Sequence, residues 1–340
     1  MNKAGFFPLM LLLALWIAAC GPKKSEGEKQ ETLSLEIERH DPRLDQIIDP
    51  EAEAVILGSG FEWTEGPLWL EKEQKLLFSD IPYNRVHSWT AEEGVSIYLE
   101  PAGFTGEGTR GGELGSNGLL LDPEGALVLC QHGDRRMAKM KAPLNSPKAE
   151  YETIVDNFEG MRFNSPNDAA YDAGGDLYFT DPPYGLEKNM EDPSKEIPFQ
   201  GVYRFSKEGE LTLLLDSISR PNGLAFSPDG GSLIIANSDP AKPIWYAYSV
   251  SSDGDLSQGR IFYDATEEFK TDKGLPDGLK VRKDGLIFAT GPGGVWIFDQ
   301  QAKVLGRLKV GELTSNVALD KAGKNLYVTA DSYVVRIALK

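Results

Sequence analysis

The chain repeats one pattern of apolar and polar positions: a single polar residue, a short apolar run, a turn rich in Asp and Gly, and a second apolar run. Successive copies begin 50 to 55 residues apart, except for the last, which begins 39 residues after the fifth. This spacing is typical of propeller blades and solenoid repeats. We call the first residue of each copy an opener; the openers are Glu65, Asn117, Asn167, Asn222, Asp277 and Asn316.

Each copy is expected to begin with a β-hairpin. The two apolar runs are joined by turns such as 172–175 and 227–230, in which Gly supplies a positive φ and Asp binds the backbone. Further apolar runs, such as 201–205 and 211–215, give four strands per copy, as in a propeller blade. No segment shows sustained helical periodicity with caps. The sequence therefore predicts an all-β fold, a six-bladed β-propeller of four-stranded blades.

The last copy is too short to provide all four strands of a blade, because it ends at Leu339 without an outer strand. An unpaired strand edge invites association with other chains. We therefore expect a strand around 54–57 to complete the last blade and to close the ring at the N-terminal end. The propeller domain is predicted to span residues 51–340.

The N-terminus resembles a bacterial lipoprotein signal. Lys3 precedes an apolar run at 9–17, which is too short to span a bilayer, and two alanines stand before Cys20. The resemblance implies a signal peptide at 1–19, lipidation of Cys20, and a domain in the bacterial cell envelope, outside the cytoplasm, that touches the membrane only through its lipid anchor. An ordinary cleaved signal is the alternative. Residues 20–50 are polar and are expected to form a flexible tether.

The charge of the chain limits its partners. The formal net charge is −17, which repels nucleic acids and anionic lipid headgroups. We expect no nucleic acid partner, and we expect the protein to be a monomer. A charged pocket in such a chain is expected to attract a cation.

The openers are expected to meet at one mouth of the central channel, since each begins the innermost strand of its blade. Carboxylates held together there raise one another's pKa unless a cation lies between them. Two carboxylates and several amide oxygens suit Ca²⁺ best, Mg²⁺ next and zinc poorly. Asn-Gly and Asp-Gly are also common in turns, so a purely conformational role of the openers is the alternative.

A second set of polar residues follows each opener by about fourteen positions, where the hairpin returns to the same mouth. The aspartates in this set either support metal ligands or end strands in turns. His132 either acts as a general base or substrate hydrogen-bonding group, or simply faces a loop. The set consists of Asp80, His132, Asp181, Asn237, Ser238 and Asp331.

Four segments, 64–69, 165–168, 221–224 and 276–278, resemble the signature segments of the SMP-30/gluconolactonase family, and two others, 130–136 and 179–185, look like its bacterial gluconolactonase branch. The resemblance implies a six-bladed propeller with one divalent ion, most often Ca²⁺. It implies that Asp277 is the catalytic base and that Asn117 and Asn316 lie near the substrate. The implied metal ligands are Glu65, Asn167, Asn222 and Asp277.

The function expected from these residues is hydrolysis of a lactone, an aldonolactone such as gluconolactone. The metal would polarise the ring carbonyl, and Asp277, alone or with His132, would take a proton from the attacking water. Tyr184 and the Gly-rich segment 104–112 are candidates for the substrate rim. The alternatives are a non-catalytic propeller that binds a ligand or partner and has a structural metal, and a phosphotriesterase-like hydrolase.

Overall fold

The computed structural model describes Met1, residues 30–108 and residues 111–340, so the expected signal peptide and the lipidation site at Cys20 lie outside the described residues. Contacts divide the chain into Met1–Gln30 and Glu31–Lys340, and the second unit holds the sheets described below. No helix in the described ranges is long and apolar enough to cross a lipid bilayer.

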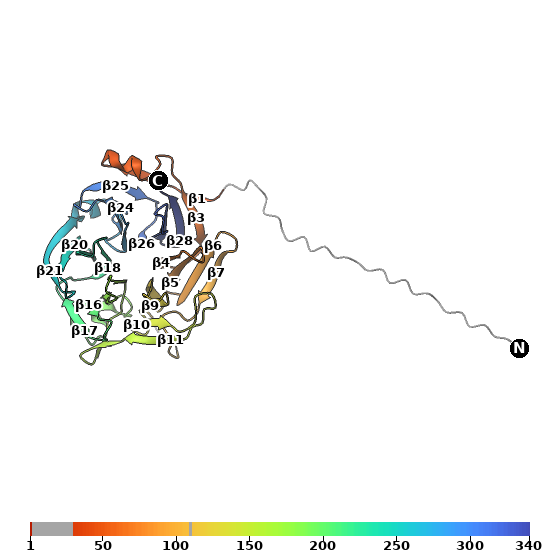
Figure 1. The fold of residues 1–340 in the computed structure, drawn as a ribbon, viewed down its shortest axis with the longest axis vertical. Coiled ribbons are helices and arrows are strands. Elements are labelled where there is room, and N and C mark those ends of the chain that lie inside the picture. The colour runs from red at the N-terminus through yellow and green to blue at the C-terminus, as the bar shows by residue number, and fades with distance from the viewer. Residues whose placement is uncertain (2–29, 109–110) are drawn as a thin grey trace. The chain divides into compact units, whose positions relative to one another are not determined.

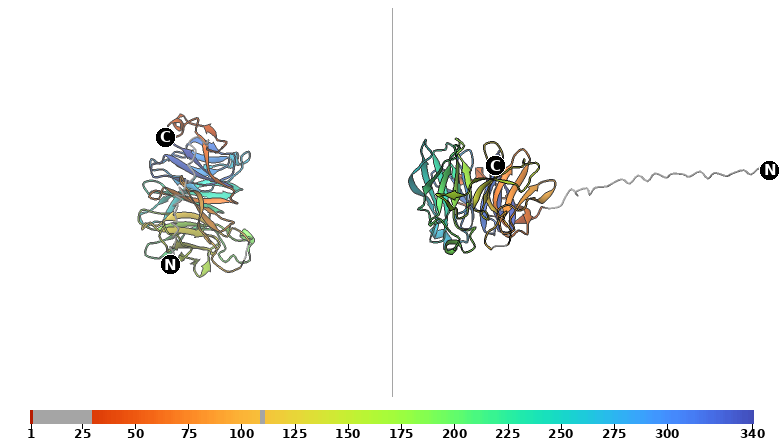
Figure 2. Two further views of the ribbon diagram at one scale, coloured as in Figure 1. Left: turned by 90° about the vertical axis from the view of Figure 1, so that its right-hand side faces the viewer. Right: turned by 90° about the horizontal axis from the view of Figure 1, so that it is seen from below.

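Six sheets of four or five strands surround a central axis in the described part of the chain (Figure 1). The strands near the axis, such as β4, β18 and β26, are followed by strands that lie progressively nearer the rim, such as β7, β17 and β21. Two side views show the sheets packed one beside the next (Figure 2). The predicted all-β, six-bladed propeller is therefore confirmed.

Blades 1 to 4 each consist of four consecutive antiparallel strands. Blade 1 is β4 (Thr64–Leu70), β5 (Lys75–Asp80), β6 (Arg85–Thr90) and β7 (Gly94–Leu99); blade 2 is β8 (Ser116–Leu121), β9 (Leu127–Gln131), β10 (Arg136–Met140) and β11 (Tyr151–Val155). After the small hairpin of β12 (Asn157–Phe158) and β13 (Met161–Arg162), blade 3 is β14 (Ala169–Tyr171), β15 (Leu177–Asp181), β16 (Gly201–Phe205) and β17 (Leu211–Leu215). Blade 4 is β18 (Pro221–Phe226), β19 (Ser232–Asp239), β20 (Lys242–Val250) and β21 (Leu256–Asp264).

Blades 5 and 6 each have a fifth strand contributed by the N-terminal part of the described chain. Blade 5 is β22 (Leu279–Val281), β23 (Ile287–Gly291), β24 (Gly294–Phe298), β25 (Val304–Lys309) and β2 (Glu36–Arg39); blade 6 is β26 (Thr314–Leu319), β27 (Asn325–Ala330), β28 (Tyr333–Ala338), β3 (Ala54–Ser59) and β1 (Thr32–Leu33). Short helices occur at η1 (Pro42–Gln46), η2 (Asn189–Glu191) and α1 (Thr266–Phe269). The antiparallel pairing of β3 with β28 confirms the expected closure of the ring by an N-terminal strand.

The segment 31–50 is ordered against blades 5 and 6, so the prediction of a flexible tether through residue 50 is wrong for this part. Besides the two added strands, η1 buries Leu44 and the chain after it buries Ile48, both fully. Charged residues that made the segment look like a tether instead form ion pairs at the blade edge, such as Arg43 with Asp299 at 2.9 Å. A few well-spaced apolar residues were enough to order a polar segment.

The hydrophobic core is divided among the interfaces between neighbouring blades. One cluster joins blades 1 and 2 around Leu77 and Leu129, and another joins blades 4 and 5 around Trp245 and Trp296. The blade 6 to blade 1 interface is built in the same way, with Phe78 packed near Tyr327. Because each blade is buried on both faces, each holds its neighbours at a fixed distance from the axis.

Nearest the axis, the blades are in backbone contact. Glycine follows the opener in four blades, and a Cβ atom there would lie 1.9 to 2.8 Å from an atom of the opener of the following blade. Real Cβ atoms do not approach other atoms this closely, so a larger side chain forces the blades apart. Glycine after these openers thus serves close inter-blade packing, and only the first of the four has a positive φ. The four are Gly66, Gly118, Gly223 and Gly278.

We predict that Gly223→Ala lowers the free energy of unfolding by about 1 to 3 kcal/mol, since its Cβ would lie 2.4 Å from the backbone oxygen of Asp277. Gly231→Ala in the same blade is the matched control, because its Cβ would meet nothing closer than 3.5 Å. Urea denaturation followed by fluorescence measures both. Equal unfolding midpoints for the two variants would contradict the packing role.

Candidate active site

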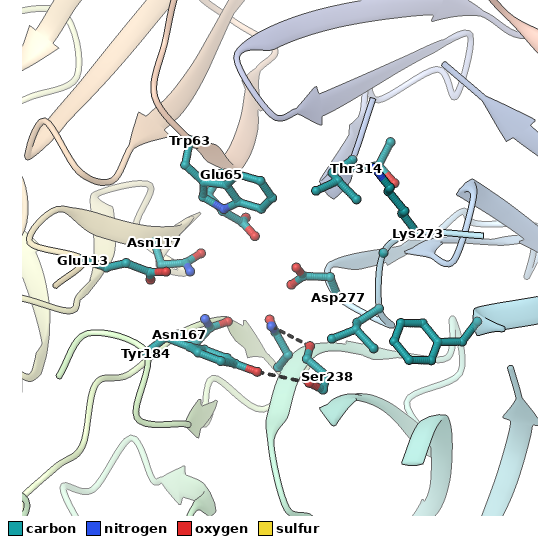
Figure 3. A pocket seen from close by; sticks show the side chains of 15 residues that line it. Trp63, Glu65, Glu113, Asn117, Asn167, Tyr184, Ser238, Lys273, Asp277 and Thr314 are labelled. Carbon is teal, nitrogen blue, oxygen red and sulfur yellow. Dashed lines mark hydrogen bonds between the residues drawn. The ribbon is translucent and has the colours of Figure 1, made fainter. Parts of the chain in front are cut away.

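Five of the six openers line one pocket at the mouth of the channel, with a volume of about 490 Å³ (Figure 3). Each opener is either the second or third residue of the innermost strand of its blade or lies two residues before that strand. The sixth, Asn316, is not a lining residue. The lining residues are Trp63, Glu65, Glu113, Asn117, Asn167, Tyr184, Asn222, Ser238, Phe269, Lys273, Gly274, Leu275, Asp277, Leu313 and Thr314.

Two carboxyl groups, Glu65 and Asp277, face each other across the pocket (Figure 3). Burial raises the pKa of Glu65 to about 8, although its carboxylate accepts hydrogen bonds from Gly66 N at 2.7 Å and Asn316 Nδ2 at 3.1 Å. Burial and repulsion from Glu65 raise the pKa of Asp277 well above its ordinary value. Without a cation, the pair therefore retains protons near neutral pH.

Several oxygens at this mouth are buried and lack hydrogen-bond partners within the described residues: Asn117 Oδ1, Asn167 Oδ1 and Asp277 Oδ1. Asn222 is oriented by its Nδ2, which donates to Ser238 Oγ at 2.9 Å. Buried oxygens without partners are costly, and a cation would satisfy them. Two carboxylates with amide oxygens are a donor set for a hard ion such as Ca²⁺. In the described ranges no group of three or more Cys, His, Asp or Glu could hold a metal.

A further acidic residue lies next to the openers on the channel axis. Asp168 stands in blade 3 at the position after the opener that glycine occupies in four other blades. Its Oδ1 accepts from Ala169 N at 2.8 Å, and its Oδ2 lies 3.8 Å from Lys280 Nζ of blade 5. The side chain of Lys280 thus partly neutralises this carboxylate from across the channel.

The aspartates of the second set end strands in turns. Asp80 accepts hydrogen bonds from Glu62 N and Trp63 N, and Asp181 accepts from Asn164 N at 2.8 Å and Ser165 N at 2.7 Å. In blade 4, Asn237 does the same for Arg220 N at 2.8 Å. These side chains therefore fix the turn that leads into the innermost strand of their own blade. None of them lines the pocket.

His132 is fully buried and does not line the pocket. Its Nδ1 lies 3.0 Å from Oε2 of Glu113, and Glu113 does line the pocket. The sequence pointed to His132 but not to Glu113, since Glu113 follows a Gly-rich segment and has no counterpart in the repeat. The one sequence signal for Glu113 was its position as an acidic residue between a Gly-rich segment and an opener.

The remaining predicted substrate residues separate into two places. Tyr184 lines the pocket, and its hydroxyl lies 3.4 Å from Ser238 O, where burial raises its pKa. Asn316 instead lies behind Glu65, to which it donates the hydrogen bond given above, while its Oδ1 accepts from Val317 N at 2.9 Å. Its position is suited to orienting the Glu65 carboxylate.

Part of the pocket lining is apolar. Trp63, Phe269, Leu275 and Leu313 line it from blades 1, 5 and 6, whereas the oxygen-bearing side chains come mainly from blades 2 to 5. Phe269 ends α1 and Leu275 follows it in the long connection between blades 4 and 5. A molecule in the pocket therefore meets carbon surfaces as well as polar atoms, and the connection that bears Phe269 and Leu275 also bears Lys273.

The fold and site define a six-bladed propeller with a candidate cation site beneath a pocket at one mouth of its channel. Residues 63–332 match the family described as SMP-30/Gluconolactonase/LRE-like region, and the chain belongs to this family.

Individual relatives agree with this membership. The chain is 38% identical to the gluconolactonase of Zymomonas mobilis over 310 residues, which cover 89% of this chain and 86% of that protein. It resembles the solved gluconolactonase of Xanthomonas campestris with a TM-score of 0.78 and 27% identity, over 93% of this chain and 99% of that one. The calcium-binding protein regucalcin of Agrobacterium tumefaciens shares the fold, with a TM-score of 0.64 and 16% identity over 84% and 94% of the chains.

Asp181 should make stability depend on pH. Burial raises its pKa to about 7, against an ordinary value of 3.8, so the folded state holds a proton that the unfolded chain has released. The contribution of Asp181 to stability is therefore largest below about pH 4 and falls as the pH rises to about 7. We predict that the free energy of unfolding of the wild type, minus that of Asp181→Asn, decreases over this range in urea titrations. Asn is compatible with this position, because in blade 4 Asn237 accepts the corresponding hydrogen bond from the turn before the innermost strand. A difference in the free energy of unfolding that does not change with pH would contradict the raised pKa of Asp181.

Proposed function

We propose that the protein is a metal-dependent lactonase that opens a sugar aldonolactone such as gluconolactone. The observation that carries the proposal is the set of buried oxygens without partners among the described residues, on Asn117, Asn167 and Asp277, beside Glu65 at the floor of a pocket that a small molecule can enter. Membership of the SMP-30/gluconolactonase family and the 38% identity to a gluconolactonase support the choice of reaction.

The residues that would hold the ion are Glu65, Asn167, Asn222 and Asp277, and Ca²⁺ fits their oxygens best. A divalent ion in this position supplies a Lewis acid for the carbonyl oxygen of the lactone. Asn316 orients Glu65 and Ser238 orients Asn222 through the hydrogen bonds described above. Such fixed partners hold the ligands in place before a substrate arrives.

The proton transfers are assigned to Asp277. Its carboxylate takes a proton from the attacking water as the new C–O bond forms, and it returns that proton to the ring oxygen as the ring C–O bond breaks, which gives a hydroxy acid. Asn117 and Tyr184 lie on the pocket wall, where they can bind the substrate. His132 is too deep to take the proton directly, because it lies behind Glu113.

The first test is hydrolysis of a panel of lactones and a phosphotriester by chelator-treated protein and by protein with Ca²⁺ restored. We expect lactone turnover only with the metal, and a fall in kcat of at least about 100-fold in Asp277→Asn. Asp253→Asn, at an exposed position, is the control for the charge change.

Two outcomes separate the parts of the proposal. A folded, metal-loaded protein that turns over no lactone would exclude the lactonase, and turnover of the phosphotriester alone would favour that hydrolase instead. Unchanged turnover in Asp277→Asn would refute only its role as the base.

Metal binding should release protons. Because the pKa of Glu65 lies at about 8 and that of Asp277 is raised, a cation competes with bound protons below that pH. We predict that Ca²⁺ affinity increases between pH 6 and 8 and that the heat of binding at pH 6.5 depends on the ionisation enthalpy of the buffer. Calorimetry in two buffers measures this. Identical heats in both buffers, or an affinity independent of pH, would show that the carboxyl pair is already ionised.

A further inference from the structure

Glu113 is an acidic side chain at the pocket that the proposed metal site and proton transfers leave without a role. It points into the pocket beside Asn117 (Figure 3), and 35% of its side chain is exposed. Within residues 30–108 and 111–340, Glu113 forms an ion-pair contact with His132 and with no Lys or Arg. An acidic group here is repelled by Asp277, which acts in the same space. Its position therefore calls for a ligand that donates hydrogen bonds.

His132 supports Glu113 from below. The imidazole is completely buried, and its Nδ1 lies 3.0 Å from Oε2 of Glu113, although this geometry makes no hydrogen bond and neither imidazole nitrogen has a hydrogen-bond partner among the described residues. A proton on Nδ1 would be donated to Oε2 after a small rotation of either side chain, which leaves the other oxygen and the remaining lone pairs of Glu113 for a ligand. The arrangement resembles the way a buried side chain orients a functional one in other sites.

The backbone that bears Glu113 is fixed at both ends of its connection. Asn84 Oδ1 accepts hydrogen bonds from three successive backbone N–H groups, those of Ala102, Gly103 and Phe104, at 2.7 to 3.1 Å. Gly115, two residues after Glu113, donates its N–H to Ile81 O and accepts from His132 N. The carboxylate is thus presented from a defined position, as specific recognition requires.

The apolar residues of the pocket lining suit the carbon face of a sugar ring. A pyranose ring has hydroxyl groups on its edge and C–H groups on its faces, and aromatic side chains pack against such faces. Trp63 and Phe269 provide these surfaces, whereas Glu113 and Asn117 provide hydrogen-bonding groups. Two neighbouring hydroxyl groups can donate to one carboxylate, and hydrogen bonds to a charged acceptor are the strong ones.

We propose that Glu113, positioned by His132, binds adjacent hydroxyl groups of the substrate and so restricts the enzyme to polyhydroxylated lactones. The inference rests on the proposed function in one respect, that the pocket is where the lactone binds. Glu113 is the specificity-determining residue, and His132 is a positioning residue that acts through it. This role replaces the expected part of His132 in proton transfer.

The kinetic test compares glucono-δ-lactone with δ-valerolactone, which has the same ring and no hydroxyl groups. Glu113→Ala should raise KM for glucono-δ-lactone by about 10- to 100-fold, as expected for a lost hydrogen bond to a charged group, with a much smaller change in kcat. The preference for glucono-δ-lactone, as the ratio of the two kcat/KM values, should fall by a similar factor. Glu124→Ala, at an exposed position in the turn between β8 and β9 and outside the pocket, is the matched control and should leave both substrates unaffected.

The positioning role of His132 is tested with a conservative and a non-conservative variant. His132→Leu, which lacks a donor, should raise KM for glucono-δ-lactone, and His132→Asn, whose amide can donate toward Glu113, should restore most of the loss. In the Glu113→Ala background, His132→Leu should have little further effect on KM, because its action passes through the missing carboxylate. Additive effects of the two substitutions would overturn the positioning role.

A binding measurement separates this inference from the proposed reaction. 1,5-Anhydroglucitol has the ring hydroxyls of the sugar but no carbonyl, and its binding can be measured by ligand-detected NMR without any turnover. Wild-type protein should bind it, and Glu113→Ala should bind it about 10-fold or more weakly. If it binds in this way while no lactone is hydrolysed, the hydroxyl-binding role stands and the proposed lactonase is wrong. Equal binding by wild type and Glu113→Ala, or equal losses for both lactones, would overturn the inference.

Discussion

The close approach of neighbouring blades at the axis is the constraint on which the rest of the structure depends. Backbone atoms of one blade contact those of the next directly beneath the openers, and hydrogen bonds such as Gly118 N to Asn167 O and Gly278 N to Ser315 O fix the spacing. Hydroxyl groups of the adjoining strands add links to the next blade, as in Thr180 to Asn222 O. Side chains that start from this rigid ring of backbone have little freedom, and this brings the pocket oxygens together.

That geometry concentrates negative charge where little water can reach it. Burial raises the pKa of both Glu65 and Asp277, the Glu65 carboxyl raises that of Asp277 further, and Asp168 raises the pKa of both. Lys280 offsets part of this charge from within the channel. The floor of the pocket is left with an excess of acceptors, a state that is stable only with protons or a cation in place. The proposed chemistry depends on this excess of negative charge. A site that favours positive charge also holds a cation next to the carbonyl group of a bound substrate.

The sequence predicted what the repeat controls. The openers occur at one phase of a periodic pattern, so their convergence followed from the fold, and the outer strand at 54–59 followed from the missing strand of the last copy. Glu113 could not be found in this way, because it lies in a connection between two blades and is not part of the repeating pattern. The order in 31–50 was hidden for a related reason, because ion pairs such as Arg43 with Asp299 at 2.9 Å form between residues far apart in the chain, and composition does not reveal them. Repetition predicts shared geometry, whereas individual contacts across the fold do not repeat.

The N-terminal strands show that the folded domain extends beyond the part of the chain that matches the family. The family match covers 63–332, but the sheet of blade 6 continues from β28 to β3 and then to β1 at its edge, and the edge of blade 5 is covered by β2. The C-terminus is also held from this side, since Lys340 N donates to Ile47 O. A fragment cut at the limits of the match would carry every residue that lines the pocket but would lack β28, β3 and β1, the outer strands of blade 6. The shortest piece that restores the pairing of β3 with β28 begins near Ala54, and the piece that also covers the edges of blades 5 and 6 begins near Glu31.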